Sequence, residues 1–549
     1  MPTIEFNKED FLELVGEELT DEEIEEKLAR VKVEVEEIED DRVEVEITSD
    51  RIDLLSVEGI ARSLRTHMEK EQGLKDYKLH DNNYEVKVED VEARPEIVTA
   101  VVKDVKLDTP TFQSLIQLQE KLHATHGRDR KRVAIGIHDI RNIEFPLTYQ
   151  SAETEEHEFI PLEKNEKMDL EEVMDNHEKG KKYKHLLEKH DKWPLITDKT
   201  GQVLSFPPVI NSRRTEVSTA SEDLFIDVTG TDRESVEHAL NVIVTMLAER
   251  GGKIHKVKMN RGDGQYETPD FSTVEKKINV DQISDYIGID LDKDKAKEYL
   301  QRMGYGVIEI GDEIEAVVPP YRSDILHQVD IAEDIAIGFG YNNIEPVVPN
   351  IATTGQEEDI IEFENMVRET MTGLRFQEVV NPTLRNKEVL NNKVKRDTEL
   401  VEIENAVSEK YTALRDSLIP QLLETLSENT HNTYPQKVFE TADVVLKDES
   451  QPVKTRTDKH LAGAMVGKES DYTDIRENLE GMLESVGVEA QFKESKGGPY
   501  IDGRCAKVIL CGEEIGKVGE IDPEVLENFG MDMPVAAFEI DLEKLRAEK

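Results

Sequence analysis

The period of the hydrophobic pattern changes repeatedly along this chain, and these changes restrict its fold more than any other feature. Apolar and charged residues alternate in VKVEVEEI (31–38) and DRVEVEITSD (41–50), as in half-buried strands. The stretch before them, FLELVGEELTDEEIEEKLARV (11–31), has the spacing of an amphipathic helix. Similar changes recur over all 549 residues without an internal repeat, so the pattern predicts a multidomain α+β protein with three or four domains.

Breaks in this pattern divide the chain into four predicted segments. The pattern resets near Pro95, and a polar stretch rich in Gly, Asp and Pro at 260–270 predicts a linker between domains. The small segment after it is expected to run strand, helix, helix, strand, strand and helix. A long helix over 360–376 opens the last segment, and a hairpin is expected across Cys511-Gly512. The predicted domains are 1–90, 91–265, 270–346 and 350–549.

The composition suggests a chain that works in concentrated salt. Asp and Glu number 119 against 69 Lys and Arg, which gives a net charge of −50 spread along the whole length. Such a charge suggests a habitat of high salt, where it keeps the protein in solution. The two cysteines, Cys505 and Cys511, make no disulfide framework, and neither a signal peptide nor a membrane-spanning run is evident. The sequence therefore predicts a soluble, cytoplasmic protein.

The segment PPYRSDILHQVDIAEDIAIGFGY (319–341) combines a helix-breaking entry with a helical pattern. Its proline pair cannot lie inside a helix, and Ser323 is a favourable N-cap for the residues that follow. At about 100° per residue, four of these residues form one apolar stripe, and Asp330 and Asp334 fall on the opposite side. The predicted stripe consists of Ile325, Val329, Ala332 and Ala336.

Four carboxylates within eleven residues make this helix a candidate cation site. Composition alone predicts about two in such a stretch, so their arrangement matters more than their number. Acids spaced i, i+3 and i+4 repel one another unless a cation lies between them, and magnesium prefers oxygen ligands of this kind. A solvated helix face and a partner's basic group remain alternatives. The four residues are Asp324, Asp330, Glu333 and Asp334.

This segment resembles the B5 domain of the phenylalanyl-tRNA synthetase beta subunit, in which a Pro-Tyr-Arg-x-Asp-Ile entry leads into an acidic helix that ends on Gly-Tyr. Further motifs, in the expected order, are similar to the same family in its archaeal and eukaryotic type. Together they cover nearly the whole chain. They are SDRIDLLSVEGIARSLR (49–65), SLIQLQEKLHATHGRDRKRVAIGIHD (114–139), VLSFPPVINSRRT (203–215), LFIDVTGTD (224–232), LRDSLIPQLLETLSENTHNTYPQKVFETADVV (414–445) and GRCAKVILCGEEIGKVGEIDPEVLENFG (503–530).

The resemblance implies a fold and an assembly. The expected architecture is an N-terminal α+β domain, a B3/B4-like editing domain, a small B5-like winged-helix-type domain and a C-terminal class II synthetase-like antiparallel sheet domain without catalytic motifs. In this family the four acids of the B5 helix are magnesium ligands, at a site shared with the alpha subunit. The expected partners are the alpha subunit, in an α2β2 heterotetramer, and tRNA(Phe). Mg²⁺ is the expected cofactor, and no membrane or DNA partner is expected.

The C-terminal segment lacks the residues that activate an amino acid in class II synthetases. Arg415 stands where an arginine for the ATP phosphate is expected, but Ser417 replaces the acid two residues later, and no Gly-rich segment ending in arginine follows. A single charged contact cannot organise a triphosphate, so Arg415 is expected in a structural ion pair. Activation of phenylalanine with ATP is therefore expected on the alpha subunit, with this chain as its scaffold.

The second segment is expected to carry an editing site, since binding alone separates similar amino acids poorly. The wrong product would be tyrosyl-tRNA(Phe), whose extra hydroxyl requires a polar group. Pro207-Pro208 stiffens a loop that presents Ser205 and Asn211, and Asp227 lies at the end of a predicted strand. We predict that these three polar residues position the substrate around an attacking water, because no His or Cys in the motifs makes an evident nucleophile. The alternative is that they only cap turns.

Contact with tRNA requires local cations, because displaced counterions supply much of the affinity. The best short basic clusters are GRDRKR (127–132) and NSRR (211–214), although either can equally neutralise neighbouring acids. The leading prediction is a beta subunit of phenylalanine-tRNA ligase that also hydrolyses mischarged tRNA. A stand-alone aminoacyl-tRNA deacylase and a non-enzymatic RNA-binding scaffold are the alternatives.

Overall fold

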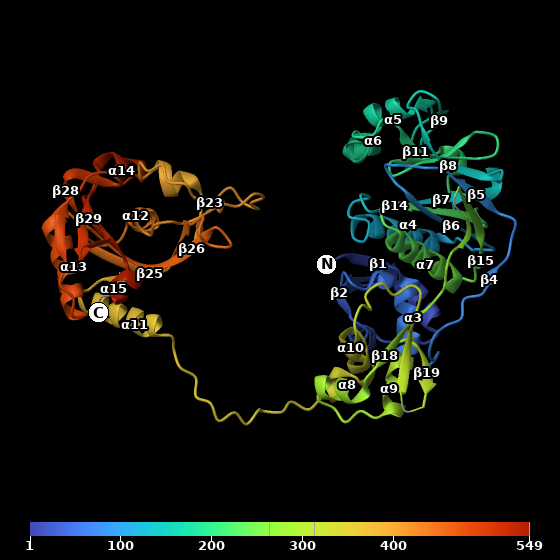
Figure 1. Ribbon diagram of the computed structural model, residues 1–549, viewed down its shortest axis with the longest axis horizontal. Coiled ribbons are helices and arrows are strands. Elements are labelled where there is room, and N and C mark those ends of the chain that lie inside the picture. Colours follow the sequence, from blue (N-terminus) through green and yellow to red (C-terminus); the bar gives the residue numbers. More distant parts are fainter. Residues whose placement is uncertain (263, 312, 548–549) are drawn as a thin grey trace. The chain divides into compact units, whose positions relative to one another are not determined.

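The computed structural model describes residues 1–262, 264–311 and 313–547. The chain forms two compact units, Met1–Val348 and Pro349–Lys549 (Figure 1). The stretch that joins them, 344–358, forms neither helix nor strand. It is therefore this stretch that separates the first three predicted segments from the last one.

The N-terminal module is a three-stranded antiparallel sheet covered by three helices. The helix predicted over 11–31 is two helices, α1 (Lys8–Val15) and α2 (Asp21–Ala29). Gly16 ends α1 in the left-handed conformation (φ 69°), and Thr20 begins α2 with a capping box. The amphipathic spacing continues across this break, which is why it predicted one helix. The sheet order is β1 (Thr3–Asn7), β3 (Arg42–Ile47), β2 (Val33–Glu39), and the third helix is α3 (Val57–His67).

The larger module of the first unit consists of two sheets packed face to face. The first sheet has the order β4 (Leu79–His80), β15 (Lys253–His255), β6 (Glu96–Lys103), β14 (Leu224–Gly230), β7 (Val133–Asp139). The second has the order β13 (Ile210–Asn211), β12 (Val203–Phe206), β11 (Trp193–Thr197), β8 (Leu147–Ala152), β5 (Glu85–Val88), β16 (Val257–Arg261), β17 (Gly264–Thr268). Apolar side chains such as Val101, Tyr149 and Phe225 fill the space between the sheets.

Helices α4 (Thr109–Ala124) and α7 (Arg233–Glu249) cover the outer face of the first sheet. Their buried side chains belong to one hydrophobic core that includes Phe11 of the N-terminal module. Strands β4 and β5, which lie within the predicted first domain, pair with strands of the larger module. The first 90 residues therefore share a core with the module that follows. Two short helices, α5 (Leu170–Asn176) and α6 (Glu178–Tyr183), cover the second sheet.

The polar stretch 260–270 forms a hairpin, and the linker predicted there is wrong. β16 and β17 pair antiparallel across it, with Arg261 opposite Gly264, while residue 263 lies outside the described residues. The Thr268 hydroxyl donates to the carbonyl oxygen of Thr99 at 2.6 Å and so ties the end of the hairpin to β6. This contact joins residues 169 positions apart, which a local pattern does not reveal.

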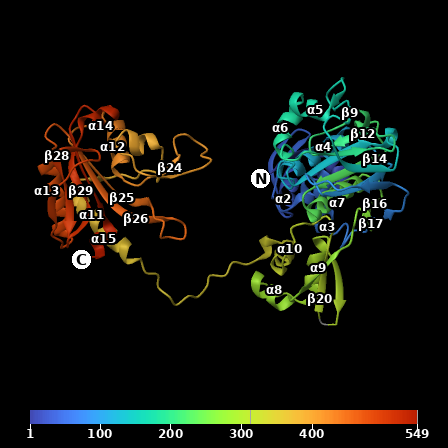
Figure 2. The same ribbon diagram turned by 45° about the horizontal axis from the view of Figure 1, so that its top comes forward.

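The small module confirms the predicted order of strand, helix, helix, strand, strand and helix. Its antiparallel sheet has the order β18 (Val274–Ile278), β20 (Glu313–Val318), β19 (Gly306–Ile310). The helices are α8 (Val280–Ile287), α9 (Lys293–Arg302) and α10 (Gln328–Phe339). Figure 2 shows these helices grouped beside β20.

The predicted start of this helix, directly after Ser323, is wrong. Helix α10 begins at Gln328. Ile325 therefore lies outside the helix and does not set the position of its apolar stripe. Val329, predicted in that stripe, is 57% exposed, and Asp334, predicted on the opposite side, is only 2% exposed. The buried residues of α10 are Ile331, Ala332, Asp334, Ile335, Ala336, Ile337 and Gly338.

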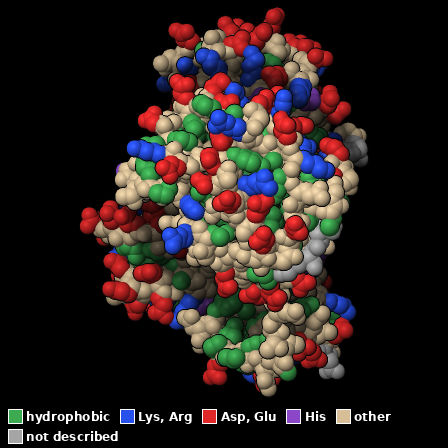
Figure 3. Space-filling model, turned by 90° about the vertical axis from the view of Figure 1, so that its left-hand side faces the viewer, with side chains coloured by type: hydrophobic (Ala, Val, Ile, Leu, Met, Phe, Trp, Pro, Cys, Tyr) green, Lys and Arg blue, Asp and Glu red, His purple; other side chains and the backbone are tan. Residues whose placement is uncertain are grey.

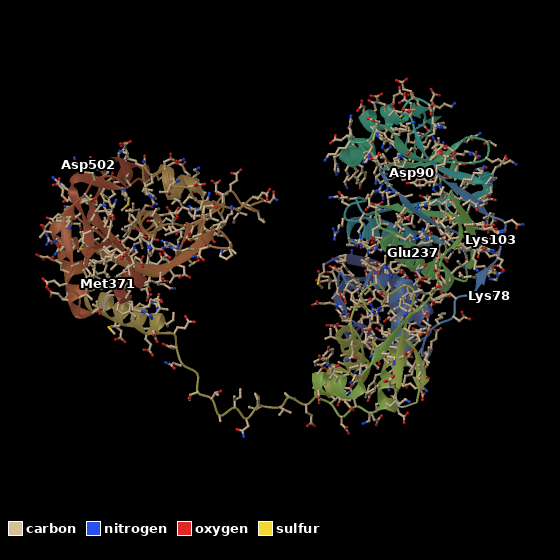
Figure 4. All side chains as sticks on the ribbon, viewed as in Figure 1. Lys78, Asp90, Lys103, Glu237, Met371 and Asp502 are labelled. Carbon is tan, nitrogen blue, oxygen red and sulfur yellow. The ribbon has the colours of Figure 1, made fainter. Side chains whose placement is uncertain are left out.

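The second unit is built on a seven-stranded sheet, which is antiparallel except for its first pair. The order is β21 (Gln377–Glu378), β25 (Gln436–Lys447), β26 (Thr455–Val466), β30 (Val535–Asp541), β29 (Glu513–Ile521), β28 (Tyr500–Leu510), β27 (Gln491–Glu494). The predicted hairpin across Cys511-Gly512 joins β28 and β29. One face is covered by α11 (Asp359–Gly373), with Met371 buried (Figure 4), α13 (Tyr472–Ser485) and α15 (Leu542–Ala547). Helix α12 (Ile419–Glu428) covers the other face.

Acidic side chains are spread over the face shown in Figure 3, with Lys and Arg between them. This agrees with a charge that is distributed along the sequence. In the ranges that the structure describes, no helix combines the length and the apolar character needed to cross a bilayer.

Candidate functional site

A cavity of about 460 Å³ lies at the edge of the two-sheet module, where β7 ends one sheet and β13 ends the other. All three residues predicted for the editing site line this cavity. Ser205 and Asn211 come from the second sheet, and Asp227 comes from the first. The face-to-face packing of the sheets thus brings together three polar residues that the sequence pattern could only propose one by one.

Ser205 and Asn211 face each other across a tight hairpin. They are directly opposite in the pairing of β12 with β13, and the Ser205 hydroxyl donates to Oδ1 of Asn211 at 2.9 Å. The side-chain amide of Asn211 donates to the carbonyl oxygen of Ile137 in β7 at 3.4 Å. Asn211 therefore connects the two sheets, which is more than the turn cap considered from the sequence.

Asp227 is held by a buried histidine that the sequence analysis did not select. Nε2 of His138 lies 2.8 Å from Oδ2 of Asp227, and Nδ1 lies 2.7 Å from the hydroxyl of Thr215. His138 is 0% exposed and Asp227 is 1% exposed. Because a carboxylate only accepts hydrogen bonds, Nε2 carries the proton of this contact and its N–H donates a hydrogen bond to Asp227. The alternation in VAIGIHD, which places Gly136 and His138 on one face of a strand, was the available signal.

The loop that contains Pro207-Pro208 is fixed by Arg130. Its guanidinium donates to the carbonyl oxygens of Pro208 and Val209, at 3.2 and 3.0 Å, and to Glu120 at 3.0 Å. The same group lies 4.7 Å above the ring of Tyr183. Arg130 is 8% exposed, so it forms part of the cavity wall and is not a surface contact for a phosphate.

The cavity offers a hydroxyl, an amide and a carboxylate in one space, and the side chains of Ser205 and Asp227 are buried. Among the described lining residues there is no cysteine or histidine that could serve as a nucleophile. Polar groups held in this way can bind an aminoacyl ester and orient a water molecule toward it. The arrangement therefore suits hydrolysis by direct attack of water.

Two of the four acids of the small module pair with one arginine. Arg322 lies 2.7 Å from Asp324 and 2.7 Å from Asp334. The hydroxyl of Tyr305 also donates to Asp334, at 2.5 Å. Burial alone would lower the pKa of Arg322, but Asp334 and the hydrogen bond to Asp324 raise that pKa well above its ordinary value. The guanidinium thus remains a fixed positive charge between the two acids.

The other two acids are engaged separately. The carboxylate of Asp330 accepts from the backbone amides of Leu326 and His327, at 2.8 and 2.6 Å, and so caps its own helix. Glu333 lies 3.0 Å from Lys32. Within the described residues, the clusters of His, Cys, Asp and Glu with ligand atoms less than 4.8 Å apart include none of these acids. In this arrangement the donors do not fit a magnesium ion held by all four.

The two basic clusters are partly used inside the protein. Arg132 lies 2.9 Å from Asp232, and Arg214 lies 2.7 Å from Asp198. Together with the buried Arg130, which pairs with Glu120, these contacts show that part of each cluster neutralises neighbouring acids. The cations that are exposed are Arg128, Lys131 and Arg213.

Arg415 forms the structural ion pair that was predicted for it. Its Nη1 lies 2.8 Å from Oε1 of Glu440, and the two side chains are 2% and 1% exposed. Nε donates to the carbonyl oxygen of Asp443 at 3.0 Å. The guanidinium is thus turned into the protein and not toward a nucleotide.

Four family models match the chain along nearly its whole length. Their descriptions are "Phe-tRNA synthetase beta subunit B1 domain" for residues 1–70, "B3/4 domain" for 87–259, "tRNA synthetase B5 domain" for 276–341 and "Phenylalanyl tRNA synthetase beta chain CLM domain" for 344–542. The B3/4 match contains every residue of the cavity named above. These domains, in this order, define a component of an aminoacyl-tRNA synthetase.

Curated relatives match from end to end. The phenylalanine-tRNA ligase beta subunit of Thermococcus kodakarensis is 41% identical over 572 residues, which covers 100% of both chains. That of Pyrococcus furiosus is 41% identical over 556 residues, or 99% of this chain and 100% of the relative. The solved N-terminal fragment of the phenylalanyl-tRNA synthetase beta subunit from Pyrococcus horikoshii is 38% identical, with a TM-score of 0.61, and covers 62% of this chain and 100% of the fragment. The chain belongs to the family of phenylalanine-tRNA ligase beta subunits, ligase components in protein biosynthesis.

Proposed function

We propose that the cavity between the two sheets hydrolyses mischarged tyrosyl-tRNA(Phe), while a separate alpha subunit attaches phenylalanine. The convergence of Ser205, Asn211 and Asp227 on one cavity is the observation that carries this proposal. The tyrosyl group has a hydroxyl that phenylalanine lacks. A buried polar site built to bind such a hydroxyl can discriminate strongly against the substrate without it.

In the proposed reaction, a water oxygen attacks the carbonyl carbon of the ester that joins tyrosine to the terminal ribose of tRNA. The bond from that carbon to the ribose oxygen breaks, and tyrosine and a free ribose hydroxyl are released. Ser205 and Asn211 position the ester and the water by hydrogen bonds. Asp227 accepts a hydrogen bond from a donor on the tyrosyl group.

The beta-subunit family implies an alpha-subunit partner and a tRNA, and we propose an α2β2 heterotetramer in which the alpha subunit uses ATP and Mg²⁺. The burial of Arg415 against Glu440 supports this division, because no phosphate can reach it there. Magnesium binding by Asp324, Asp330, Glu333 and Asp334 stays a prediction from the family resemblance, and it requires these acids to leave the partners described above. Work on tRNA is consistent with the predicted cytoplasmic location. For the domain bounds, we propose the four segments predicted from the sequence, with β4 and β5 of the first segment contributing to the sheets of the second.

Deacylation of tyrosyl-tRNA(Phe) by the alpha-beta complex tests the proposal. Asn211→Ala is expected to slow the reaction by about 100-fold, the usual scale for one positioned donor. Asn176→Ala, at an exposed position in the same module, is the matched control and should not change the rate. Equal rates for wild type and Asn211→Ala would remove Asn211 from the site.

The same preparations separate the alternatives. Phenylalanine-dependent pyrophosphate exchange should appear only when the alpha chain is added. Hydrolysis by the single chain together with no exchange in the mixture would favour a stand-alone deacylase. Absence of hydrolysis in every mixture would favour a non-enzymatic scaffold.

A further inference from the structure

We propose that His138 is a positioning residue of the cavity, which orients Asp227 toward the ligand, and that Gly136 provides the space this contact requires. The inference rests on the proposed hydrolysis and adds two residues to its site. Neither residue was selected from the sequence, and each acts through Asp227.

The strand pairing places the three residues on one face. In the antiparallel pairing of β7 with β14, Asp227 lies directly opposite Gly136, and His138 follows two positions later. Alternate residues of a strand share a face, so Gly136, His138 and Asp227 all lie on the side of the sheet that faces the second sheet. The intervening Ile137 belongs to the core on the opposite side. The Asp227 side chain therefore lies over Gly136 and reaches His138.

Gly136 is required by this arrangement. A Cβ atom at this position would lie 2.1 Å from Oδ2 of Asp227 and 2.8 Å from Nε2 of His138. Contacts this short are not possible, so any side chain at residue 136 would displace the carboxylate or the imidazole. Since Gly136 itself lines the cavity, the displacement would occur at the site and not elsewhere in the fold.

The imidazole is fixed from both ends. Nδ1 of His138 contacts the hydroxyl of Thr215 at 2.7 Å, and that hydroxyl can also donate to the carbonyl oxygen of Ser212 at 3.3 Å. With neutral His138, Thr215 donates to Nδ1. With charged His138, Nδ1 donates to Thr215, which then donates to Ser212. In both states Nε2 of His138 carries a proton and donates a hydrogen bond to Asp227, so the orientation of the carboxylate is the same in each.

One carboxylate oxygen remains for the ligand. Among the contacts of the described residues, His138 binds Oδ2 of Asp227, and no hydrogen bond reaches Oδ1. When a hydrogen bond fixes one oxygen of a carboxylate, the other oxygen points in a single direction. Metal-binding side chains are oriented in the same way by hydrogen bonds on the side away from the metal. Oδ1 can accept from the phenol hydroxyl or the ammonium group of a tyrosyl substrate.

The test uses the alpha-beta complex with tyrosyl-tRNA(Phe), and aminoacylation with phenylalanine as the control for folding. His138→Leu removes the donor and should lower kcat/KM for deacylation by 10- to 100-fold, the scale for misplacing one hydrogen bond to a charged group. His138→Gln retains an N–H donor and should recover most of the loss, which a purely structural role would not allow. Gly136→Ala keeps both polar groups and should lower kcat/KM as His138→Leu does. Adding His138→Leu to Asp227→Asn should cause little further loss, because both changes act on one contact.

A binding measurement distinguishes the failure of this inference from the failure of the proposed function. The probe is tyrosyl-adenosine in which an amide replaces the ester, so that it binds without being cleaved. Wild type should bind it at least tenfold more tightly than His138→Leu or Gly136→Ala. Equal binding and equal deacylation in wild type and His138→Leu would overturn the role of His138. If wild type binds the probe in a way that depends on His138 but does not deacylate tyrosyl-tRNA(Phe), the proposed hydrolysis is wrong and the positioning role stands. If wild type neither binds the probe nor deacylates, the proposed hydrolysis and the positioning role are both wrong.

Discussion

Arg322 and Asp334 form an ion pair that is almost completely removed from water. Nη2 of Arg322 lies 2.7 Å from Oδ2 of Asp334, and the side chains are 2% and 3% exposed. The same guanidinium binds both oxygens of Asp324, at 2.8 and 2.7 Å. One arginine thus neutralises two of the four acids that the sequence suggested as magnesium ligands. Removing one partner of such a pair strongly destabilises a protein, because the other charge then stays buried without a counterion.

Arg322→Met should therefore destabilise the small module by about 3–5 kcal/mol. The substitution keeps an apolar chain of similar length and leaves Asp324 and Asp334 without their cation. Hydrogen exchange of the backbone amides in α10 measures the local free energy of opening. The matched control is Arg30→Met, which breaks an exposed pair with Glu26 and should cost only about 0.3–0.5 kcal/mol. Equal, small effects for the two variants would show that the buried pair is not needed.

Chelation of divalent metal should leave the thermal midpoint of the isolated chain unchanged. The reason is that Arg322, Lys32 and the backbone amides at the start of α10 already satisfy the four acids. Melting in the presence and absence of excess EDTA provides the measurement. A fall in the midpoint that added Mg²⁺ reverses would contradict this expectation and would support an ion bound by these acids.

The order of elements in the small module could be predicted because period-two and helical patterns alternate there without interruption. The burial of Asp334 could not, since helical periodicity treats a carboxylate as solvent-facing. Its partners both lie in coil, Tyr305 directly before β19 and Arg322 before α10, and only tertiary packing brings them to the helix. The late start of α10 escaped prediction for a related reason, because the helix begins after His327, whose backbone amide donates to the Asp330 side chain, and not after Ser323.

A pH dependence is expected from His460 in the second unit. Nδ1 of His460 lies 2.8 Å from Oε1 of Glu539, and the side chains are 16% and 14% exposed. Burial would lower the pKa of His460, but the hydrogen bond with Glu539, aided by Asp541 and Asp458, raises it. An unfolded histidine titrates near about 6.5. The pair therefore stabilises the fold fully below that pH, and this contribution is lost as the pH rises through the raised pKa.

Urea unfolding of wild type and His460→Gln, followed between pH 6 and pH 9, measures this effect. The free energy of unfolding of the second unit should fall with rising pH in wild type and change less in the variant. His431→Gln, at an exposed position of the same unit, should behave as wild type. The same slope in wild type and His460→Gln would contradict the assignment.

In the candidate site, the sequence identified Ser205 and Asn211 beside a turn. It also identified Asp227, which was expected at the end of a strand but lies in the middle of β14. It missed Gly136 and His138, which lie inside β7. Ser205 and Asn211 flank Pro207-Pro208, and a stiff loop is visible in the sequence. The contact between His138 and Asp227 joins positions 89 residues apart through the pairing of β7 with β14. The register of this pairing cannot be derived from either segment alone, so the contact is not visible in the sequence.

The exposed cations beside the cavity should bind tRNA. Lys131 follows Arg130, and Arg213 lies two residues after Asn211, while both Arg130 and Asn211 line the cavity. Lys131→Ala and Arg213→Ala should each weaken binding of tRNA(Phe) and reduce the slope of log affinity against log salt by about 1, the expected effect of one phosphate contact. Filter binding at KCl concentrations of about 0.1 to 0.5 M measures the affinity and the slope. In this range salt only partly screens the attraction between protein cations and phosphates. Lys454→Ala, at an exposed position of the second unit, is the matched control and should leave the slope unchanged. If Lys131→Ala and Arg213→Ala also bind with the wild-type slope, the two basic clusters serve only the internal ion pairs already described.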